Sequence, residues 1–502
     1  MELTAEQKDI IATEIKRGQV MKIRAFAGAA KTTTLREYAL QRPFSKFLYL
    51  AFNTENANSA QRSFPKNVKC QTVHSLAYGK TGFKYKHKLA NLQAFTVKDH
   101  CGVGNYKVAK YLVEVINNFL CSSDAKIAEP HLIIVRSEGD PTDKEDELAR
   151  KDSKTKQYLL EKANDIWKAM QDEKNLKVPM THDGYLKLYQ LMREQVTADF
   201  VMLDEAHDTN NVTLDIFLNQ NAAKILVGDS HQAIYGFRRA FNAIDQTRAT
   251  VEKYLSTSFR FGPAIAGIAT MLLADFKAES RVVHGFQSRD IVGKINRNQP
   301  FTYIARTNGQ IFDEAAKLSS QRGASYGFIG TRADKDFSPY DPYYFNRIED
   351  IYRLATGQRE NIKDASIKRF ATFGELLSVA NDKDCPDKEL LARASVVRRY
   401  SHETPEVIRR IVAHAKDPLK ADVNFVTAHR SKGLEYDQVV LADDFQQLLV
   451  TDENTGLVRP VQIDDIDPQE INLLYVAATR AKKTLELNPN LCGYQKFIES
   501  KK

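Results

Sequence analysis

Long hydrophobic runs are missing from this chain of 502 residues. No stretch of about 18 apolar residues occurs, and this absence excludes a membrane-spanning helix. The chain starts with the polar segment MELTAEQKDII, which is not a secretory signal. Only five cysteines are present and none forms a CxxC pair. Their spacing excludes a zinc ribbon and favours a reducing, intracellular setting.

A strong excess of one charge is also missing. The net charge is +8, from 72 basic and 64 acidic residues, so a polyanionic partner is permitted but not required. The contents of 43% hydrophobic and 27% charged residues are those of a globular protein. The chain shows no internal repeat and no low-complexity tail. Its length predicts roughly three domains.

Short apolar runs alternate with helical patterns in two parts of the chain. The predicted strands are Met21–Phe26, Phe47–Phe52, Phe200–Leu203 and Lys224–Val227 in the first part, and Tyr303–Ala305, Val423–Thr427 and Val439–Ala442 in the second. Continuous apolar runs of this kind are typical of buried parallel strands. We therefore expect an α/β protein with two such domains, interrupted by mostly helical insertions at residues 80–194 and 331–420.

A phosphate-binding loop is predicted in the segment Ala25–Leu35, AFAGAAKTTTL, between a strand and a helix. In this arrangement backbone N–H groups and the helix N-terminus face the phosphates. Lys31 would neutralise the terminal phosphates and the Thr32 hydroxyl would hold magnesium. The expected nucleotide-binding residues are Ala27, Gly28, Ala29, Ala30, Lys31, Thr32 and Thr33.

Ala30 departs from the pattern G-x-x-x-x-G-K-[ST], because it replaces the second glycine. Its methyl group lies where the backbone should approach phosphate, a change that can weaken or abolish nucleotide binding. From this segment alone, a chance strand–turn–helix with a surface lysine stays open as an alternative.

An acidic pair follows the third apolar run, in the segment LDEAHD. Asp204 is expected to hold magnesium, directly or through water, and Glu205 to polarise the attacking water. The end of a strand is where α/β sheets place ligand groups, and adjacent residues of an extended chain point in different directions. The alternative is a pair of solvated acids at the surface.

The segment VGDSHQAIYGFRRA, Val227–Ala240, resembles motif III of UvrD/Rep helicases of superfamily 1, which reads GDxxQxIYxFRGA. The resemblance implies that Gln232 senses the γ-phosphate. It also implies that Tyr235 and Phe237 stack on bases of single-stranded DNA beside the basic Arg238. Stacking of this kind contributes about 1–3 kcal/mol per base. Ordinary core aromatics are the alternative.

Three further segments resemble the DNA-contacting motifs of that family. LAFNTENA resembles motif Ia and TVHSLAY resembles motif Ib, while TAHRSKGLEYDQVVL resembles motif V. By this resemblance the DNA-contacting residues would be Phe52, Asn53, Thr72, His74, Thr427 and His429. A lone histidine is more often structural, so His74 depends on its place in the series.

Other matches imply nucleotide contacts. Gln7, in LTAEQKDII, resembles the glutamine that reads adenine, although Thr4 to Gln7 also form a predicted capping box. In TSFRFGPAI, which resembles motif IV, Phe259 would stack on adenine and Arg260 would reach the γ-phosphate. Glu435 would bond the ribose. Arg480, in LLYVAATRAKK, would be the arginine finger of motif VI.

The resemblance covers nearly the whole chain and is strongest to the helicase core of F-box DNA helicases and their prokaryotic relatives. It implies two RecA-like P-loop NTPase domains with ATP between them. Domain 1A would comprise residues 1–79 and 195–246, with insertion 1B at 80–194. Domain 2A would comprise residues 247–330 and 421–502, with insertion 2B at 331–420.

The implied function is an ATP- and Mg²⁺-dependent helicase or translocase that moves 3′ to 5′ on single-stranded DNA in repair or recombination. Its partners would be single strands and single/double-strand junctions, and it would act as a monomer in the cytoplasm, at the nucleoid or in the nucleus. Two alternatives remain. One is a translocase that strips proteins from DNA and unwinds poorly. The other is a DNA-binding subunit with a weakened ATPase that serves a partner, for example in phage defence.

Overall fold

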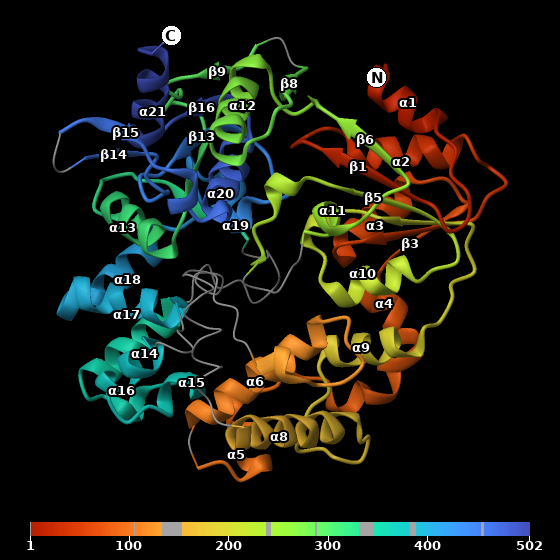
Figure 1. Ribbon diagram of the computed structural model, residues 1–502. Helices are drawn as coiled ribbons and strands as arrows, with labels where there is room; N and C mark the ends of the chain where they lie inside the picture. The colour runs from red at the N-terminus through yellow and green to blue at the C-terminus, as the bar shows by residue number, and fades with distance from the viewer. Residues whose placement is uncertain are drawn as a thin grey trace. The chain divides into compact units, whose positions relative to one another are not determined.

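The computed structural model describes residues 2–104, 106–132, 153–236, 242–286, 289–330, 345–381, 388–452 and 456–501. The chain divides into two compact units, Met1–Ser256 and Thr257–Lys502, each built on its own parallel sheet (Figure 1). The predicted α/β class is therefore confirmed. None of the described helices is long and apolar enough to cross a membrane.

The first unit contains a six-stranded parallel sheet with the order β3-β2-β4-β5-β1-β6. Its strands are Val20–Ala25 (β1), Phe47–Ala51 (β2), Val68–Thr72 (β3), Phe200–Leu203 (β4), Ala223–Gly228 (β5) and Val251–Leu255 (β6). The four predicted strands correspond to β1, β2, β4 and β5, each to within a residue at either end. β2, β4 and β5 are buried at every position, which explains their continuous apolar sequences.

The boundary between the units lies later than predicted. Residues Val251–Leu255 pair in register with Met21–Ala25, so β6 is the edge strand of the first sheet and not the start of the second unit. The division between the two units follows Ser256, whereas the predicted boundary follows residue 246. The sequence VEKYL has charged residues on an exposed edge, so it lacks the apolar run of an inner strand.

Helices pack against both faces of the first sheet and make up most of the described part of the 80–194 segment. They are Ala5–Ala12 (α1), Lys31–Leu40 (α2), Thr54–Ser63 (α3), Val73–Ala77 (α4), Ala94–Cys101 (α5), Tyr106–Cys121 (α6), Ser153–Gln171 (α8), His182–Met192 (α9), Asn211–Leu218 (α10) and Ala243–Gln246 (α11). α5, α6, α8 and α9 lie together at one end of this unit (Figure 1). Their buried side chains, such as Phe119 and Trp167, share a core with Leu48 and Leu203 of the sheet.

The second unit contains another six-stranded parallel sheet, with the order β11-β12-β10-β13-β16-β9. Its strands are Ile291–Val292 (β9), Phe301–Ala305 (β10), Tyr326–Phe328 (β11), Val423–Thr427 (β12), Tyr436–Leu441 (β13) and Ala481–Glu486 (β16). The three predicted strands correspond to β10, β12 and β13. Two small pairs accompany this sheet: Thr257–Ser258 (β7) with His284–Gly285 (β8), and Leu449–Thr451 (β14) with Val458–Pro460 (β15).

The helices of the second unit include a group between β11 and β12 in the sequence. They are Pro263–Lys277 (α12), Asn308–Ser319 (α13), Phe345–Ala355 (α14), Ala365–Lys368 (α15), Phe373–Ala380 (α16), Lys388–Tyr400 (α17), Thr404–His414 (α18), Ala428–Ser431 (α19), Pro468–Ala478 (α20) and Pro489–Glu499 (α21). α14 to α18 fall in the predicted insertion. α20 is buried from Ile471 through Ala478, so it has no polar face and belongs to the core.

Candidate functional site

The end of β1 leads through a short loop into α2, which begins at Lys31. Ala27 and Ala29 are buried in this loop. No side chain caps the helix, so the N–H groups of its first turn are directed at the space where the loop ends. A helix N-terminus with unsatisfied N–H groups and a lysine at its first position is suited to bind a phosphate.

Ala30 has φ 54° and ψ 39°, which is the left-handed region that favours glycine. A side chain in this conformation costs about 1–2 kcal/mol. The loop nevertheless has the geometry for which the missing glycine is normally needed. The departure from the motif therefore appears in the structure as local strain at Ala30 and not as a different loop.

The predicted catalytic groups of the first unit come together at the carboxyl ends of β1, β4 and β5. The Lys31 Nζ atom lies 3.3 Å from Glu205 Oε2, and the Lys31 side chain is 12% exposed. Burial alone would lower the pKa of Lys31, but the charges of Glu205, Asp204 and Asp229 outweigh burial and raise it. Lys31 therefore stays charged at neutral pH.

Asp204 is a buried acid of this cluster. Its carboxylate accepts bonds from the Tyr49 hydroxyl, from the Thr32 hydroxyl at 3.3 Å and from the Glu205 N–H at 2.9 Å. Burial and the charge of Glu205 raise the pKa of Asp204, and Lys31 opposes this shift. A hydroxyl and a carboxylate at this distance are hard oxygen ligands of the kind that Mg²⁺ uses beside substrate phosphates, so Thr32 and Asp204 fit such an ion.

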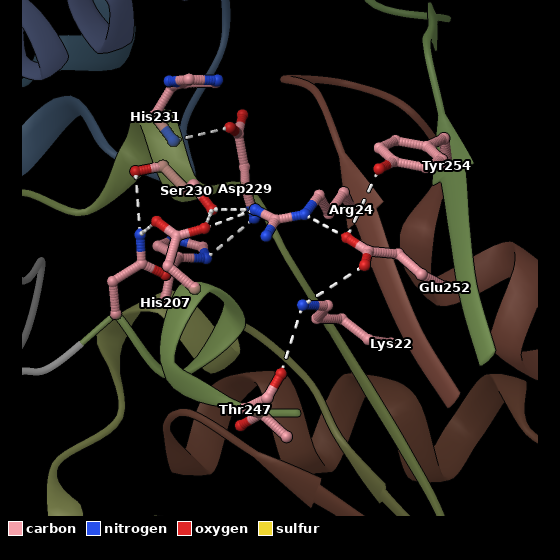
Figure 2. Close-up of polar contacts among 11 residues, drawn as sticks. Lys22, Arg24, His207, Asp229, Ser230, His231, Thr247, Glu252 and Tyr254 are labelled. Carbon is pink, nitrogen blue, oxygen red and sulfur yellow. Dashed lines mark hydrogen bonds and ion pairs between the residues drawn. The ribbon is translucent and has the colours of Figure 1, made fainter. Parts of the chain in front are cut away.

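His207, which the sequence reasoning did not single out, connects the acidic pair with the next motif. The Asp229 N–H donates to His207 Nδ1 at 3.0 Å, so the ring carries its proton on Nε2. Asp229 in turn accepts the Gln232 side-chain amide at 2.7 Å. A Cβ at Gly228 would lie 2.8 Å from His207 Nδ1, so the close approach of the ring requires glycine there. Figure 2 shows His207 beside Asp229.

Gln7 forms the predicted capping box at the start of α1, which confirms that part of the interpretation. Its Oε1 atom accepts from the Thr4 N–H at 3.0 Å, and its Nε2 atom donates to Thr34 Oγ1 at 3.0 Å. The side chain is buried and ties α1 to α2. Contact with adenine stays a prediction, and it would have to add to or replace these bonds.

Two aromatic rings predicted to contact DNA lie side by side in the first unit. The Phe52 and Tyr235 rings are stacked, with 6.1 Å between centroids and 6° between planes. Phe52 follows β2, Tyr235 follows β5, and Phe52 is 44% exposed. Rings presented in this way can stack on bases. Phe237 and Arg238 lie outside the described residues.

The polar DNA candidates of the first unit also have local structural bonds. The Asn53 side chain caps α3 by accepting the Asn56 N–H, and Thr72 caps α4 by accepting the Ser75 N–H. His74 Nε2 lies 3.2 Å from Asp183 Oδ1 on α9. These three residues follow or end β2 and β3, so they share the carboxyl edge of the sheet with the charged cluster.

In the second unit several of the predicted nucleotide residues lie close together at one edge of its sheet. Arg260 Nε donates to Glu435 Oε2 at 3.1 Å, and its Nη1 donates to the Thr479 carbonyl at 3.1 Å. Glu435 directly precedes β13 and Arg480 directly precedes β16, and these two strands are parallel neighbours. The group therefore lies at the amino ends of the strands.

Arg480 is held inside the second unit and is only 1% exposed. Its guanidinium donates to the carbonyls of Val476 and Leu434 and to the Thr479 hydroxyl, at 2.8, 3.2 and 3.2 Å. Two of these partners lie in or directly after the last turn of α20, whose carbonyl end attracts cations. The role as an arginine finger stays a prediction.

The remaining candidates of the second unit are divided between two places. The Phe259 ring contacts Phe286, with 4.9 Å between centroids. Thr427 is buried and ends β12, and His429 lies in the following helix, α19. These two predicted DNA residues therefore lie at the carboxyl edge of the sheet, opposite the edge that carries Glu435.

Comparisons with known proteins agree with the motif order. The family model "UvrD/REP helicase N-terminal domain" matches residues 3–248, and "UvrD-like helicase C-terminal domain" matches residues 172–489. The chain is 35% identical to F-box DNA helicase 1 of Gallus gallus over 517 residues, covering 98% of this chain and 49% of that protein. It is 30% identical to F-box DNA helicase protein 1 of Schizosaccharomyces pombe over 549 residues, covering 99% and 59%. The chain thus spans about half the length of these curated relatives.

Proposed function

Because this chain belongs to the UvrD-like helicase family, we propose that it hydrolyses ATP to move along single-stranded DNA as a helicase or translocase. The observation that carries the proposal is the cluster of Lys31, Thr32, Asp204 and Glu205 at the N-terminus of α2. A cation, a hydroxyl and two carboxylates at a phosphate-binding helix end supply the groups that phosphoryl transfer needs.

Each residue has a distinct role in this proposal. Lys31 and the N–H groups of α2 bind the terminal phosphates. Thr32 and Asp204 would hold Mg²⁺, which would neutralise charge on those phosphates. Glu205 orients the attacking water. Gln232, fixed by Asp229, responds to the γ-phosphate.

The second unit contributes the other nucleotide residues of the proposal. Phe259 stacks on adenine and Glu435 bonds the ribose. Arg260 and Arg480 offset negative charge that develops in the transition state. The two units correspond to domains 1A and 2A, each with one helical insertion.

The stacked rings of Phe52 and Tyr235 support single-stranded DNA as the track, because stacking tolerates any base sequence. Asn53, Thr72, His74, Thr427 and His429 would line the track beside them. The direction is 3′ to 5′, the enzyme acts as a monomer, and its role lies in DNA repair or recombination.

ATP hydrolysis tests this proposal, measured with and without single-stranded DNA for the wild type and for Lys31→Ala. Wild-type activity should be stimulated by DNA, and Lys31→Ala should abolish it because the terminal phosphates lose their cation. Lys8→Ala, on an exposed lysine of α1, is the matched control and should behave as the wild type. Failure of DNA to stimulate hydrolysis, with Lys31→Ala equal to the wild type, would contradict the motor.

The strain at Ala30 favours one second candidate, a DNA-binding subunit with a weakened ATPase. An Ala30→Gly variant separates the two. Equal rates for both proteins would show that the alanine is tolerated. Hydrolysis found only in Ala30→Gly, together with wild-type DNA binding, would favour the second candidate.

Strand-displacement assays define the direction and the type of motor. Substrates with a 3′ or a 5′ single-stranded overhang should be unwound only from the 3′ side. A parallel assay that follows release of a protein bound to DNA separates helicases from translocases. Protein release without strand separation would assign the chain to the second class.

A further inference from the structure

Two cations lie on one face of β1, directly before the phosphate loop. Lys22 and Arg24 are two residues apart, so their side chains point to the same side of the sheet. Inner strands of parallel sheets are usually apolar, and β1 lies between β5 and β6. Figure 2 shows both cations among acids and hydroxyls from other segments. This network lies outside the proposed catalytic groups.

Arg24 joins three segments that are far apart in the sequence. Its Nε atom donates to Glu252 Oε1 on β6 at 2.5 Å. Its Nη1 atom donates to Ser230 Oγ at 3.2 Å and to the Asp245 carboxylate on α11. The Arg24 side chain is 30% exposed, so these charge-assisted bonds are partly shielded from solvent.

Ser230 belongs to the loop that carries Gln232 and leads to Tyr235. This loop is held from two sides. On one side, His207 accepts the Asp229 N–H and Asp229 accepts the Gln232 amide. On the other side, Arg24 and Asp245 both bond Ser230 Oγ, at 3.2 and 3.0 Å.

The segment that enters α11 is also bonded to Ser230. Asn242 Nδ2 donates to Asp245 Oδ2 at 2.7 Å and to the Ser230 carbonyl at 3.5 Å. Asp245 therefore binds both the segment that enters α11 and the Arg24 guanidinium. The strand that ends in the phosphate loop is thus connected to both ends of the segment that carries Tyr235.

Lys22 holds the edge of the sheet independently of Arg24. Its buried Nζ atom donates to the Thr247 carbonyl at 3.2 Å and lies 3.5 Å from Glu252 Oε2. These contacts hold β6 and the end of α11 against β1 without any contact to Ser230. The sheet edge therefore keeps a cation for Glu252 when Arg24 is changed.

We propose that Arg24 is a positioning residue that transmits DNA binding at Tyr235 to ATP hydrolysis at Lys31, through its bonds to Ser230 and Asp245. The proposal rests on the proposed function. Because Arg24 fixes the loop against the phosphate-loop strand, a displacement of Tyr235 by DNA is passed to Gln232 and the phosphate site. Without Arg24 the loop loses its side-chain bond to the strand that ends in the phosphate loop, while Ser230 keeps its bond to Asp245 and Asp229 keeps its bond to His207.

The test compares Arg24→Gln, Arg24→Lys and the wild type in ATP hydrolysis, with and without single-stranded DNA. The ratio of the stimulated to the unstimulated kcat should fall at least about fivefold in Arg24→Gln, the size expected from the loss of bonds to charged partners. Arg24→Lys should recover part of the ratio. KM for ATP should change less than about twofold, because Arg24 touches none of the proposed ATP-binding groups.

Lys253→Gln is the matched control. Lys253 lies on the edge strand β6, next to Glu252, and pairs with Asp9 at 2.7 Å, away from the loop. It should keep the wild-type ratio. A wild-type ratio in an Arg24→Gln protein of unchanged melting temperature would overturn the proposal. An unstimulated wild type would instead contradict the proposed function itself.

Ser230→Ala gives a second measurement through a smaller change. It removes the hydroxyl that Arg24 bonds and leaves both carboxylates paired. The ratio should fall less than in Arg24→Gln, and the double variant should be no worse than Arg24→Gln alone, because both changes break one connection. Additive losses would show that the two residues act separately and would overturn the proposal.

Discussion

The charged groups proposed to act on ATP lie where parallel strands end in the first unit, whereas those of the second unit lie where strands begin. In the first unit Lys31 opens α2, and the acids Asp204 and Glu205 follow β4. In the second unit Glu435 and Arg480 precede β13 and β16, and Arg480 bonds the last turn of α20. One site thus uses the positive end of a helix and the other uses the negative end.

This difference sets the charge that each site attracts. A lysine at a helix N-terminus is opposed by the helix dipole, and three acids, Asp204, Glu205 and Asp229, compensate for it. Ionised, they outnumber the single cation, and this balance fits the Mg²⁺ ion that we propose for the first site. The arginines of the second unit are favoured by the helix C-terminus and need only Glu435 and backbone carbonyls. Their excess positive charge fits the role toward phosphate that we propose for them.

Glu205→Gln, at the first site, should have the largest effect on kcat. The change removes the group proposed to orient water but keeps its size, so kcat should fall about 10²–10⁴-fold while the dissociation constant of a fluorescent ATP analogue changes little. Steady-state hydrolysis and analogue titration measure the two quantities. Glu37→Gln, an acid of α2 paired with its neighbour Arg36, is the control and should leave kcat unchanged. A fall below tenfold would remove Glu205 from the mechanism.

Arg480→Lys, at the second site, should have a smaller effect on kcat than Glu205→Gln. Lysine keeps the charge but cannot reproduce the fork of bonds to Val476 and Leu434, so kcat should fall about 10–100-fold with little change in KM. Arg410→Lys is the matched control, because Arg410 of α18 donates to Ser319 Oγ at 3.1 Å. A lower melting temperature with unchanged kcat would make Arg480 a structural residue only.

The sequence indicated the position on the sheet more fully for the candidate residues of the first unit than for those of the second, for a physical reason. Residues that follow a buried apolar strand, such as Lys31 and Asp204, can be placed at a carboxyl edge from the pattern alone. Glu435 and Arg480 precede strands that carry charges, YDQVVL and AKKTLE, so neither the strand start nor its edge was evident. β3, β6 and β9 were missed because short or exposed strands lack a continuous apolar run.

Two buried lysines of the first unit, Lys31 and Lys187, differ in the direction of their pKa shifts. Lys31 faces acids and its pKa is raised. Burial instead lowers the pKa of Lys187 to about 8, although its Nζ atom bonds the Ser122 carbonyl and contacts the Phe119 ring. Between that value and the ordinary lysine pKa, the unfolded chain binds one proton more than the folded protein. Stability contributed by this group therefore rises with pH in that window and is lowest below it.

Lys187→Met should remove this dependence. From pH 7 to pH 9.5 the melting temperature of the first unit should rise by about 2–5 °C less in the variant than in the wild type, measured by scanning calorimetry. Lys224→Met is a second variant of the same kind, because burial also lowers the Lys224 pKa. It should likewise make the melting temperature less dependent on pH. An unchanged pH profile in Lys187→Met would show that Lys187 does not titrate there.

Ala30→Gly should have the smallest effect on activity. Ala278→Gly is the equivalent change in the second unit. Ala30 and Ala278 are both left-handed alanines, with φ 54° and φ 50°, at the start of α2 and the end of α12. Glycine relieves the strain but makes the unfolded chain more flexible, so each change should stabilise its unit by about 0.5 kcal/mol, or 1–2 °C. Because the loop already has the conformation that phosphate binding needs, KM for ATP should change less than about threefold in Ala30→Gly and not at all in Ala278→Gly. A large gain in ATP affinity confined to Ala30→Gly would show instead that the methyl group obstructs the phosphate.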